Sequence, residues 1–225
     1  DCGKGTQLKM RQLGVKTARL YTVLISHLHG DHCFGLIGLI STLGMMGRTQ
    51  PLHIYAHADL EKLLRPLLDY HCQDLSFEVE FHAINPRKRA VIFEDRTLTI
   101  ETIPLKHKVP TCGFLFIEHH RDKEPRKRYA YCSDTAYREQ IVEQIAGVEV
   151  LFHEATYTEK DVDKCKKHTH STAKQAAQIA KLAGVGKLVI GHFSAREDDH
   201  MVFLNESQEI FSNTVLAEEC QIIEI

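Results

Sequence analysis

The stretch YTVLISHLHGDHCFG, at residues 21 to 35, places four metal-capable side chains directly behind an apolar run. The run YTVLIS is typical of a strand that is covered on both faces. The four side chains follow within residues 27–32 and are His27, His29, Asp31 and His32. Imidazole and carboxylate groups held this close must find partners or become neutral if they are buried. We therefore expect a positive charge to sit among them.

The rest of the chain alternates strand-like and helix-like segments. We expect further strands at 51–56, 89–94, 98–105, 113–118, 128–134, 148–155, 187–192 and 220–225, and helices at 33–47, 58–71, 137–147, 173–184 and 205–213. Pro66 should disturb the second helix, and Gly147 should end the third. Thr172 and Gln175 have the spacing of a capping box for the fourth helix. With no linker or repeat in the sequence, we expect a single α/β domain over residues 1–225.

The composition excludes several classes of protein. A chain of 225 residues that is 43% hydrophobic and 26% charged is typical of an ordinary globular protein. Its seven cysteines are scattered and never spaced as C-x-x-C, which argues against a disulfide framework or a zinc knuckle and favours the cytoplasm. We expect no membrane span and no signal peptide. The net charge of −2 argues weakly against a strongly nucleic-acid-binding surface.

Metal-capable residues also stand at the ends of predicted strands far apart in the sequence. The four that do so are His27, His107, Asp134 and His192. The carboxyl ends of strands in a layered α/β fold line one edge, where ligands bind. The sequence therefore predicts that these four segments deliver their side chains to one place.

The residue types favour a centre with two metal ions. Neutral imidazoles with carboxylates suit Zn²⁺, Fe or Mn²⁺, and the absence of thiolates argues against a structural zinc. His27 and His29 can share one ion, Asp31 and His32 can hold a second, and Asp134 can bridge both. Two ions about 3.5–4 Å apart clamp the attacking and leaving oxygens of an in-line displacement.

The histidine-rich segment at 26–32 resembles the signature of a known family. SHLHGDH is the HxHxDH signature of the metallo-β-lactamase superfamily, whose fold is a four-layer αββα sandwich. The chain further resembles the ribonuclease Z family of tRNA 3′-processing endonucleases in the order of its motifs, which are DCGKGTQ at 1–7, HLHGDHCFG at 27–35, PLKHKVPTCGF at 104–114, YCSDT at 131–135, FHEAT at 152–156, HSTAKQAA at 170–177 and GHFSAR at 191–196. The HST and HxSxR motifs separate this family from the lactamases.

The resemblance implies a zinc-dependent endoribonuclease that removes the 3′ trailer from precursor tRNA. A metal-bound hydroxide would attack the phosphodiester and leave a 3′-hydroxyl on the tRNA. The resemblance implies two Zn²⁺ per subunit, with Mn²⁺ or Fe as alternatives. The implied ligands are His27, His29 and His107 for one ion and Asp31, His32 and His192 for the other, with Asp134 bridging.

The resemblance also implies roles in proton transfer. Asp31 would accept a proton from the attacking water, and His170 would act as general acid or as a donor to a phosphate oxygen. Glu154 would orient His170, because a neutral histidine needs a partner that fixes its tautomer. Ser194 and Arg196 would help to hold the site or a phosphate.

Three departures from the family pattern stand out. The family has strands ahead of DCG, and these strands are missing here. The family also has a long arm that grips the tRNA, and we expect that arm to be short or absent near 117–127. Lys4 stands where the family usually has an acidic residue. The first two departures leave the chemistry intact but affect the grip on tRNA and independent folding. The resemblance further implies a cytoplasmic homodimer with precursor tRNA as its partner and no membrane association.

Two other functions stay open on the sequence. The first is a superfamily hydrolase of small phosphodiesters or esters, which a short arm favours and the HST motif disfavours. The second is a catalytically inactive tRNA- or partner-binding paralogue, which ranks last because every expected ligand is present.

Other histidines and cysteines receive simpler interpretations. We expect no ligand role for His53, His57, His71, His82, His119, His120 and His200. His153 should be a core or supporting histidine, and His168 stays open. Cys33 and Cys132 should be small core residues rather than nucleophiles.

Overall fold

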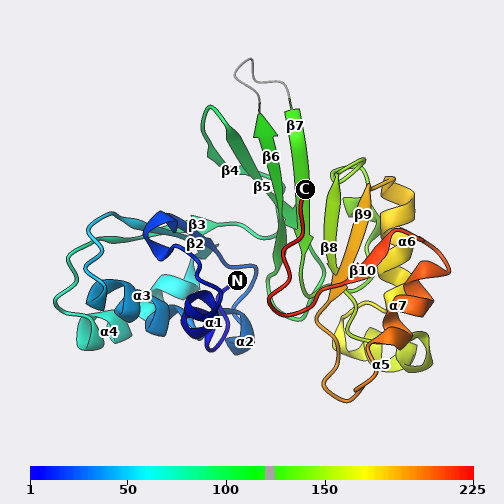
Figure 1. The fold of residues 1–225 in the computed structure, drawn as a ribbon, viewed down its shortest axis with the longest axis horizontal. Helices are drawn as coiled ribbons and strands as arrows, with labels where there is room; N and C mark the ends of the chain where they lie inside the picture. Colours follow the sequence, from blue (N-terminus) through cyan, green and yellow to red (C-terminus); the bar gives the residue numbers. More distant parts are fainter. Residues whose placement is uncertain (120–124) are drawn as a thin grey trace. The chain divides into compact units, whose positions relative to one another are not determined.

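The computed structural model describes residues 1–119 and 125–225, and it divides into two compact units, Asp1–Asn85 and Pro86–Ile225 (Figure 1). Each unit has its own sheet and its own core. The interpretation of the whole chain as a single domain stays a prediction. The arm region near 117–127 falls partly on residues 120–124, which lie outside the described residues, so the expectation of a short arm also stays a prediction. No helix of the described ranges is long and apolar enough to cross a membrane.

The first unit is a parallel sheet with helices that bury one of its faces. The strands β1 (Thr22–Leu24), β2 (Leu52–His57) and β3 (Val79–Ile84) lie in the order β1-β2-β3, and the helices are α1 (Thr6–Gln12), α2 (Gly30–Cys33), α3 (Leu36–Met45) and α4 (Asp59–His71). Burial alternates along β2, so Leu52 and Ile54 face the core. α4 continues through Pro66, because its leucines anchor the helix against that core on both sides of the proline.

The second unit contains a mixed seven-stranded sheet in the order β10-β9-β8-β7-β6-β5-β4. Its strands are β4 (Val91–Glu94), β5 (Leu98–Pro104), β6 (Cys112–His119), β7 (Pro125–Cys132), β8 (Val150–Glu154), β9 (Lys187–Gly191) and β10 (Thr214–Leu216). Strands β4 to β7 pair antiparallel, and β7 to β10 pair parallel. Consequently β5, β7, β8 and β9 run in one direction, and their carboxyl ends meet at one edge of the sheet.

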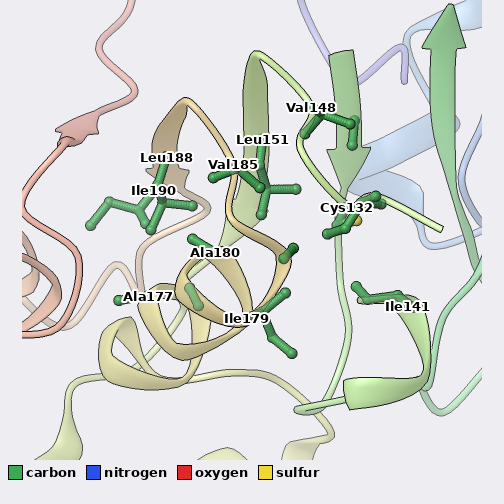
Figure 2. Packing of buried hydrophobic residues seen from close by; sticks show 14 of the residues in the cluster. Cys132, Ile141, Val148, Leu151, Ala177, Ile179, Ala180, Val185, Leu188 and Ile190 are labelled. Atoms are coloured by element: carbon green, nitrogen blue, oxygen red, sulfur yellow. The ribbon is translucent and has the colours of Figure 1, made fainter. Parts of the chain in front are cut away.

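Helices α5 (Val162–His168), α6 (Ala173–Ala183) and α7 (Met201–Gln208) complete the second unit. Ala177, Ile179 and Ala180 of helix α6 belong to one buried cluster with Leu151 and Leu188 of the sheet (Figure 2). The small alanine side chains let the helix backbone approach the sheet closely. The predicted capping box of Thr172 and Gln175 is present at the start of α6.

Several predicted elements differ in the structure. The helix expected at 137–147 is wrong, because the segment contains only a short 3₁₀ helix, Glu139–Ile141. The strand expected at 220–225 is also wrong, because the strand that pairs with β9 is β10, at Thr214–Leu216. The last helix lies at Met201–Gln208 rather than at 205–213. The elements α1, α2, β3 and α5 were not expected from the sequence.

Candidate metal centre

In the first unit, the segment that follows β1 carries four of the predicted ligands. We call His27, His29, Asp31 and His32 the loop group. His27 and His32 are buried, whereas Asp31 is exposed. His29 is the residue that precedes helix α2, and Asp31 lies in the first turn of that helix. The short helix therefore reverses the chain so that these side chains come from two sides of one turn.

The carboxylate of Asp1 fixes the orientation of two loop-group histidines. Its Oδ2 accepts hydrogen bonds from Nδ1 of His32 at 2.9 Å and from the hydroxyl of Ser26 at 2.9 Å. Since Ser26 gives its proton to Asp1, its oxygen accepts from Nδ1 of His27 at 2.9 Å. Both imidazoles thus carry their proton on Nδ1, and their Nε2 atoms are unprotonated, as in a metal-binding histidine.

The atoms of the loop group that could bind a metal ion face one another in pairs. Nε2 of His27 lies 3.0 Å from Nδ1 of His29, and the two rings meet edge to face. Nε2 of His32 lies 3.5 Å from Oδ2 of Asp31. Each pair of atoms therefore points at a common position.

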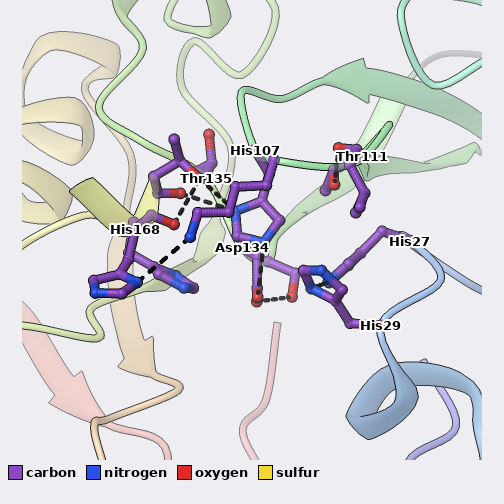
Figure 3. A network of polar contacts seen from close by, with 12 residues as sticks. His27, His29, His107, Thr111, Asp134, Thr135 and His168 are labelled. Atoms are coloured by element: carbon purple, nitrogen blue, oxygen red, sulfur yellow. Dashed lines mark hydrogen bonds and ion pairs between the residues drawn. The ribbon is translucent and has the colours of Figure 1, made fainter. Parts of the chain in front are cut away.

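In the second unit, the edge formed by the carboxyl ends of the strands carries the other predicted ligands. These ligands are His107, Asp134 and His192, and together with His170, the predicted proton donor beside them, we call them the sheet-edge group. His107 follows β5, Asp134 follows β7, and His192 follows β9. Asp134 is buried, and its two oxygens lie 3.7 Å from Nε2 of His107 and 3.2 Å from Nε2 of His192. Figure 3 shows the His107 and Asp134 side chains. Nδ1 of His107 donates to the Thr169 carbonyl at 2.9 Å, so the ring proton is on Nδ1 and Nε2 is unprotonated.

Glu154, the last residue of β8, holds two histidines of the sheet-edge group. This carboxylate is fully buried, and its Oε1 accepts from Nδ1 of His170 at 2.7 Å. Its Oε2 accepts from the Thr156 hydroxyl at 2.8 Å, and the Thr156 oxygen in turn accepts from Nδ1 of His192 at 3.0 Å. Ligand atoms of Asp134, His170 and His192 lie within 4.8 Å of one another.

The buried ion pair of Glu154 and His170 changes the pKa of both groups. Burial acts to lower the pKa of His170, but the hydrogen bond and the charge of Glu154 outweigh it and raise that pKa above its usual value. Burial acts to raise the pKa of Glu154, but the hydrogen bond and charge of His170 outweigh it and lower that pKa. We infer that the pair favours a negative Glu154 and a positive His170.

The backbone at His192 is strained. Its φ angle is 62°, in the left-handed region that residues other than glycine rarely adopt. This backbone conformation turns the chain directly after β9, at the residue whose imidazole lies 3.2 Å from the carboxylate of Asp134. Strain of this kind is common where a side chain must be aimed at a ligand.

The donor set of each group, taken by itself, fits a divalent cation such as Zn²⁺. Four imidazoles form a hydrogen bond to the protein through Nδ1, and their Nε2 faces a side-chain atom of another predicted ligand. They are those of His27, His32, His107 and His192. This pattern is typical of metal-binding histidines. Imidazoles and carboxylates without a thiolate are also the ligands of catalytic rather than structural zinc.

The other residues singled out from the sequence lie in various places. Ser194 donates its backbone N–H to the Thr156 carbonyl at 3.0 Å, and Arg196 is exposed. Nδ1 of His168 lies 3.5 Å from the Lys108 ammonium. The thiols of Cys33 and Cys132 are buried, and burial raises the pKa of Cys132 to about 12, which argues against a nucleophile.

Sequence reasoning missed four supporting residues, namely Asp1, Ser26, Thr156 and Thr169. Asp1, Ser26 and Thr156 supply side-chain hydrogen bonds to histidines, and Thr169 supplies a carbonyl. Asp1 and Thr156 lie inside the DCG and HEAT motifs, so the motifs themselves were the available signal. Ser26 directly precedes His27 and was part of the quoted signature.

Comparisons with known proteins show the family of this chain. A model of the beta-lactamase superfamily domain matches residues 1–193. Ribonuclease Z of Bacteroides fragilis (strain YCH46) is 44% identical over 97% of this chain and 86% of the relative. Ribonuclease Z of Phocaeicola vulgatus is 45% identical over 100% of this chain and 87% of the relative. The match with the second relative runs over 268 positions, whereas the chain has 225 residues, so that relative has internal residues without a counterpart here.

Solved structures show the same fold. The crystal structure of human tRNase Z, short form, matches with a TM-score of 0.84 and 27% identity over 100% of this chain and 86% of that one. The metallo-β-lactamase fold protein YhfI from Bacillus subtilis matches with a TM-score of 0.77 and 23% identity over 97% of this chain and 83% of that one. The predicted metallo-β-lactamase fold is thereby confirmed.

Proposed function

Because the chain belongs to the ribonuclease Z family of the β-lactamase superfamily, we propose that it is an endoribonuclease that removes the 3′ trailer from precursor tRNA. The observation that carries this proposal is the 44–45% identity to relatives named Ribonuclease Z over nearly the whole chain. The likeness to human tRNase Z supports the same substrate class. The cytoplasmic homodimer implied by the family resemblance belongs to the proposal, and light scattering of the purified protein tests the dimer.

We propose that the loop group and the sheet-edge group act as one centre for two Zn²⁺ ions. The ligands would be His27, His29 and His107 for one ion and Asp31, His32 and His192 for the other, with Asp134 shared. The Nδ1 hydrogen bonds of His27, His32, His107 and His192 support a ligand role for these four histidines. When bound, such ions neutralise charge on a phosphodiester and lower the pKa of water toward about 7.

The remaining steps fall to side chains of this chain. The exposed carboxylate of Asp31 would take the proton of the attacking water. The bond from phosphorus to the 3′ oxygen of the tRNA breaks, and that oxygen needs a proton to become the 3′-hydroxyl. His170 would supply it from Nε2, since Glu154 holds the Nδ1 proton and raises the pKa of the imidazole.

The test is cleavage of a 3′-extended tRNA precursor by the purified protein, with and without a chelator. A nitrophenyl phosphodiester runs alongside as the small substrate. We expect a single chelator-sensitive cut next to the acceptor end. Turnover of the small diester without any cut in the tRNA would instead favour a hydrolase of small phosphodiesters. This alternative is tested because the second relative has internal residues that this chain lacks.

The Asp31→Ala variant tests the role of one named residue. We expect its cleavage rate to fall by at least about 100-fold, because a positioned proton acceptor contributes about 10²–10⁴ in rate. The far-UV circular dichroism and the Tm should stay close to those of the parent, since Asp31 is exposed. Full activity in a folded Asp31→Ala protein would contradict the assignment.

A further inference from the structure

A second histidine group lies in the first unit, on the strands β2 and β3 and away from the loop group in sequence. It consists of His53, Glu80 and His82. The parallel register places His53 opposite Glu80, and Tyr55 opposite His82. Because side chains two residues apart share a face of a strand, all of these side chains lie on one face. The buried residues Leu52 and Ile54 alternate with them and face the core, so the group occupies the other face of β2.

Three donor atoms of this group converge on one position. Nδ1 of His53 lies 3.1 Å from Nε2 of His82 and 3.2 Å from Oε2 of Glu80, and the third side of the triangle is 3.8 Å. Ligands at about 2.0–2.1 Å from a tetrahedral zinc ion stand about 3.3 Å apart. The observed triangle therefore needs only small side-chain adjustments to hold a metal ion.

Direct hydrogen bonds cannot join all three atoms of this triangle at once. A single N–H on Nδ1 of His53 points toward either Glu80 or His82, and it cannot make a straight hydrogen bond to both. The separation of 3.8 Å between His82 and Glu80 is too long for a direct hydrogen bond. A cation at the centre would be bound by all three atoms at once.

The surroundings fix the group and keep it accessible. The ring of Tyr55 stacks on that of His82, with centroids 4.4 Å apart and an interplanar angle of 15°, which orients the imidazole. The three side chains of the group are about one third exposed, at 33%, 34% and 36%. An ion can thus enter from solvent, and a water molecule can complete its coordination.

We propose that His53, Glu80 and His82 form a binding site for a divalent transition-metal ion, Zn²⁺ foremost, that joins β2 to β3. Two imidazoles and one carboxylate are an established ligand set for zinc. The site is separate from the centre of the proposed function and shares no residue with it. Because its ligands come from two strands, bound metal stabilises the sheet of the first unit against unfolding.

Equilibrium dialysis of the full chain against Zn²⁺, followed by elemental analysis, tests the site. We expect His53→Gln and His82→Gln each to bind one zinc ion fewer per chain than the parent. His57→Gln is the matched control, since His57 lies on the same face of β2 and outside the triangle, and it should keep the parent count. Parent-like binding by His53→Gln and His82→Gln, or an equal loss in His57→Gln, would overturn the proposal.

Two further measurements keep the result independent of folding and of the proposed function. Glu80→Gln retains both imidazoles, and we expect it to bind the extra ion at least about tenfold more weakly. Added Zn²⁺ should raise the Tm of Asp31→Ala more than that of an Asp31→Ala/His53→Gln double variant. An equal rise in both proteins would contradict the site, whatever the outcome of the tRNA assay.

Discussion

At the scale of single residues, the two buried or half-buried carboxylates Asp1 and Glu154 work in the same way. Each accepts a hydrogen bond directly from one histidine and holds a second histidine through a hydroxyl group. The two sets are Asp1 with His32 and, through Ser26, His27, and Glu154 with His170 and, through Thr156, His192. One negative charge thereby fixes the tautomer of two imidazoles, which is less costly than burying two carboxylates.

The Thr156→Val variant tests this arrangement. Valine has the shape of threonine without the hydroxyl, so Glu154 loses a donor and Nδ1 of His192 loses its acceptor. We expect the zinc affinity of the protein to fall about 10–100-fold. The free energy of unfolding should fall by about 1–3 kcal/mol, because buried polar atoms lose their partners. Dialysis against Zn²⁺ and urea unfolding measure the two effects.

Thr158→Val is the matched control for that experiment. Thr158 is buried as well, but its hydroxyl oxygen has no hydrogen-bond partner among the described residues. The same substitution there should leave zinc affinity unchanged and should leave the stability unchanged or slightly higher. Equal losses in the two variants would show that the hydroxyl of Thr156 has no special role.

The sequence was informative about the loop group and uninformative about what holds it. His27, His29, Asp31 and His32 are neighbours in the chain, so a short motif can reveal them. Asp1 lies far from His32 in the sequence, and their contact depends on how β1 and α2 fold together. Contacts of that kind have no local pattern, so the DCG motif marks Asp1 without revealing that it holds His32.

At the scale of elements, apolar runs predicted most strands correctly. One predicted helix and one predicted strand were wrong, and in both cases tertiary packing decided the outcome. Residues 137–147 have the apolar spacing of a helix, yet the chain there turns and forms no regular α-helix. This path still buries Ile141 and Ile145 in the core of the second unit. Tertiary packing here overrides local propensity. Likewise the β-branched, apolar residues of 220–225 predict a strand, but Thr214–Leu216 occupies the position beside β9.

The capping box of α6 allows a test of element stability close to His170. The Thr172 hydroxyl accepts from the N–H of Gln175 at 3.2 Å, and the Gln175 side chain accepts from the N–H of Thr172 at 3.1 Å. We expect Thr172→Ala to lower the free energy of unfolding by about 1 kcal/mol, because an N–H at the start of the helix loses its acceptor. Urea unfolding monitored by circular dichroism measures this change.

Thr172→Ser separates the cap from other effects of the substitution. Serine keeps the hydroxyl and is an equally good N-cap residue, so its stability should stay within about 0.5 kcal/mol of the parent. A serine variant as unstable as the alanine variant would show that the methyl group, and not the cap, stabilises this position.

At the scale of the whole molecule, the buried histidine His153 links stability to pH. The residue is fully buried on β8, and its Nδ1–H donates to the Glu154 carbonyl at 2.7 Å. Its Nε2 is buried and has no hydrogen-bond partner within the described parts of the chain. Burial lowers the pKa of His153, and the nearby Glu154 offsets this only in part. A proton on this imidazole is therefore disfavoured in the folded protein.

The direction of the pH effect follows from where the proton binds. In the unfolded chain a histidine has a pKa of about 6.5, so below that pH the unfolded state binds a proton that folded His153 does not. The contribution of His153 to stability is thus fully present above about pH 6.5 and is lost as the pH falls. Its slope reaches at most about 1.4 kcal/mol per pH unit.

Comparison with His153→Phe isolates this contribution from those of the other histidines. Phenylalanine has a ring of similar size and does not titrate, so the variant should lose less stability than the parent between pH 7.5 and pH 5.5. Urea unfolding at both pH values gives the difference, and His71→Gln, which removes an exposed histidine, is the control. Parallel pH profiles for the parent and His153→Phe would mean that the second unit accommodates the charged imidazole. The buried Nε2 would then have to reach a partner as the pH falls.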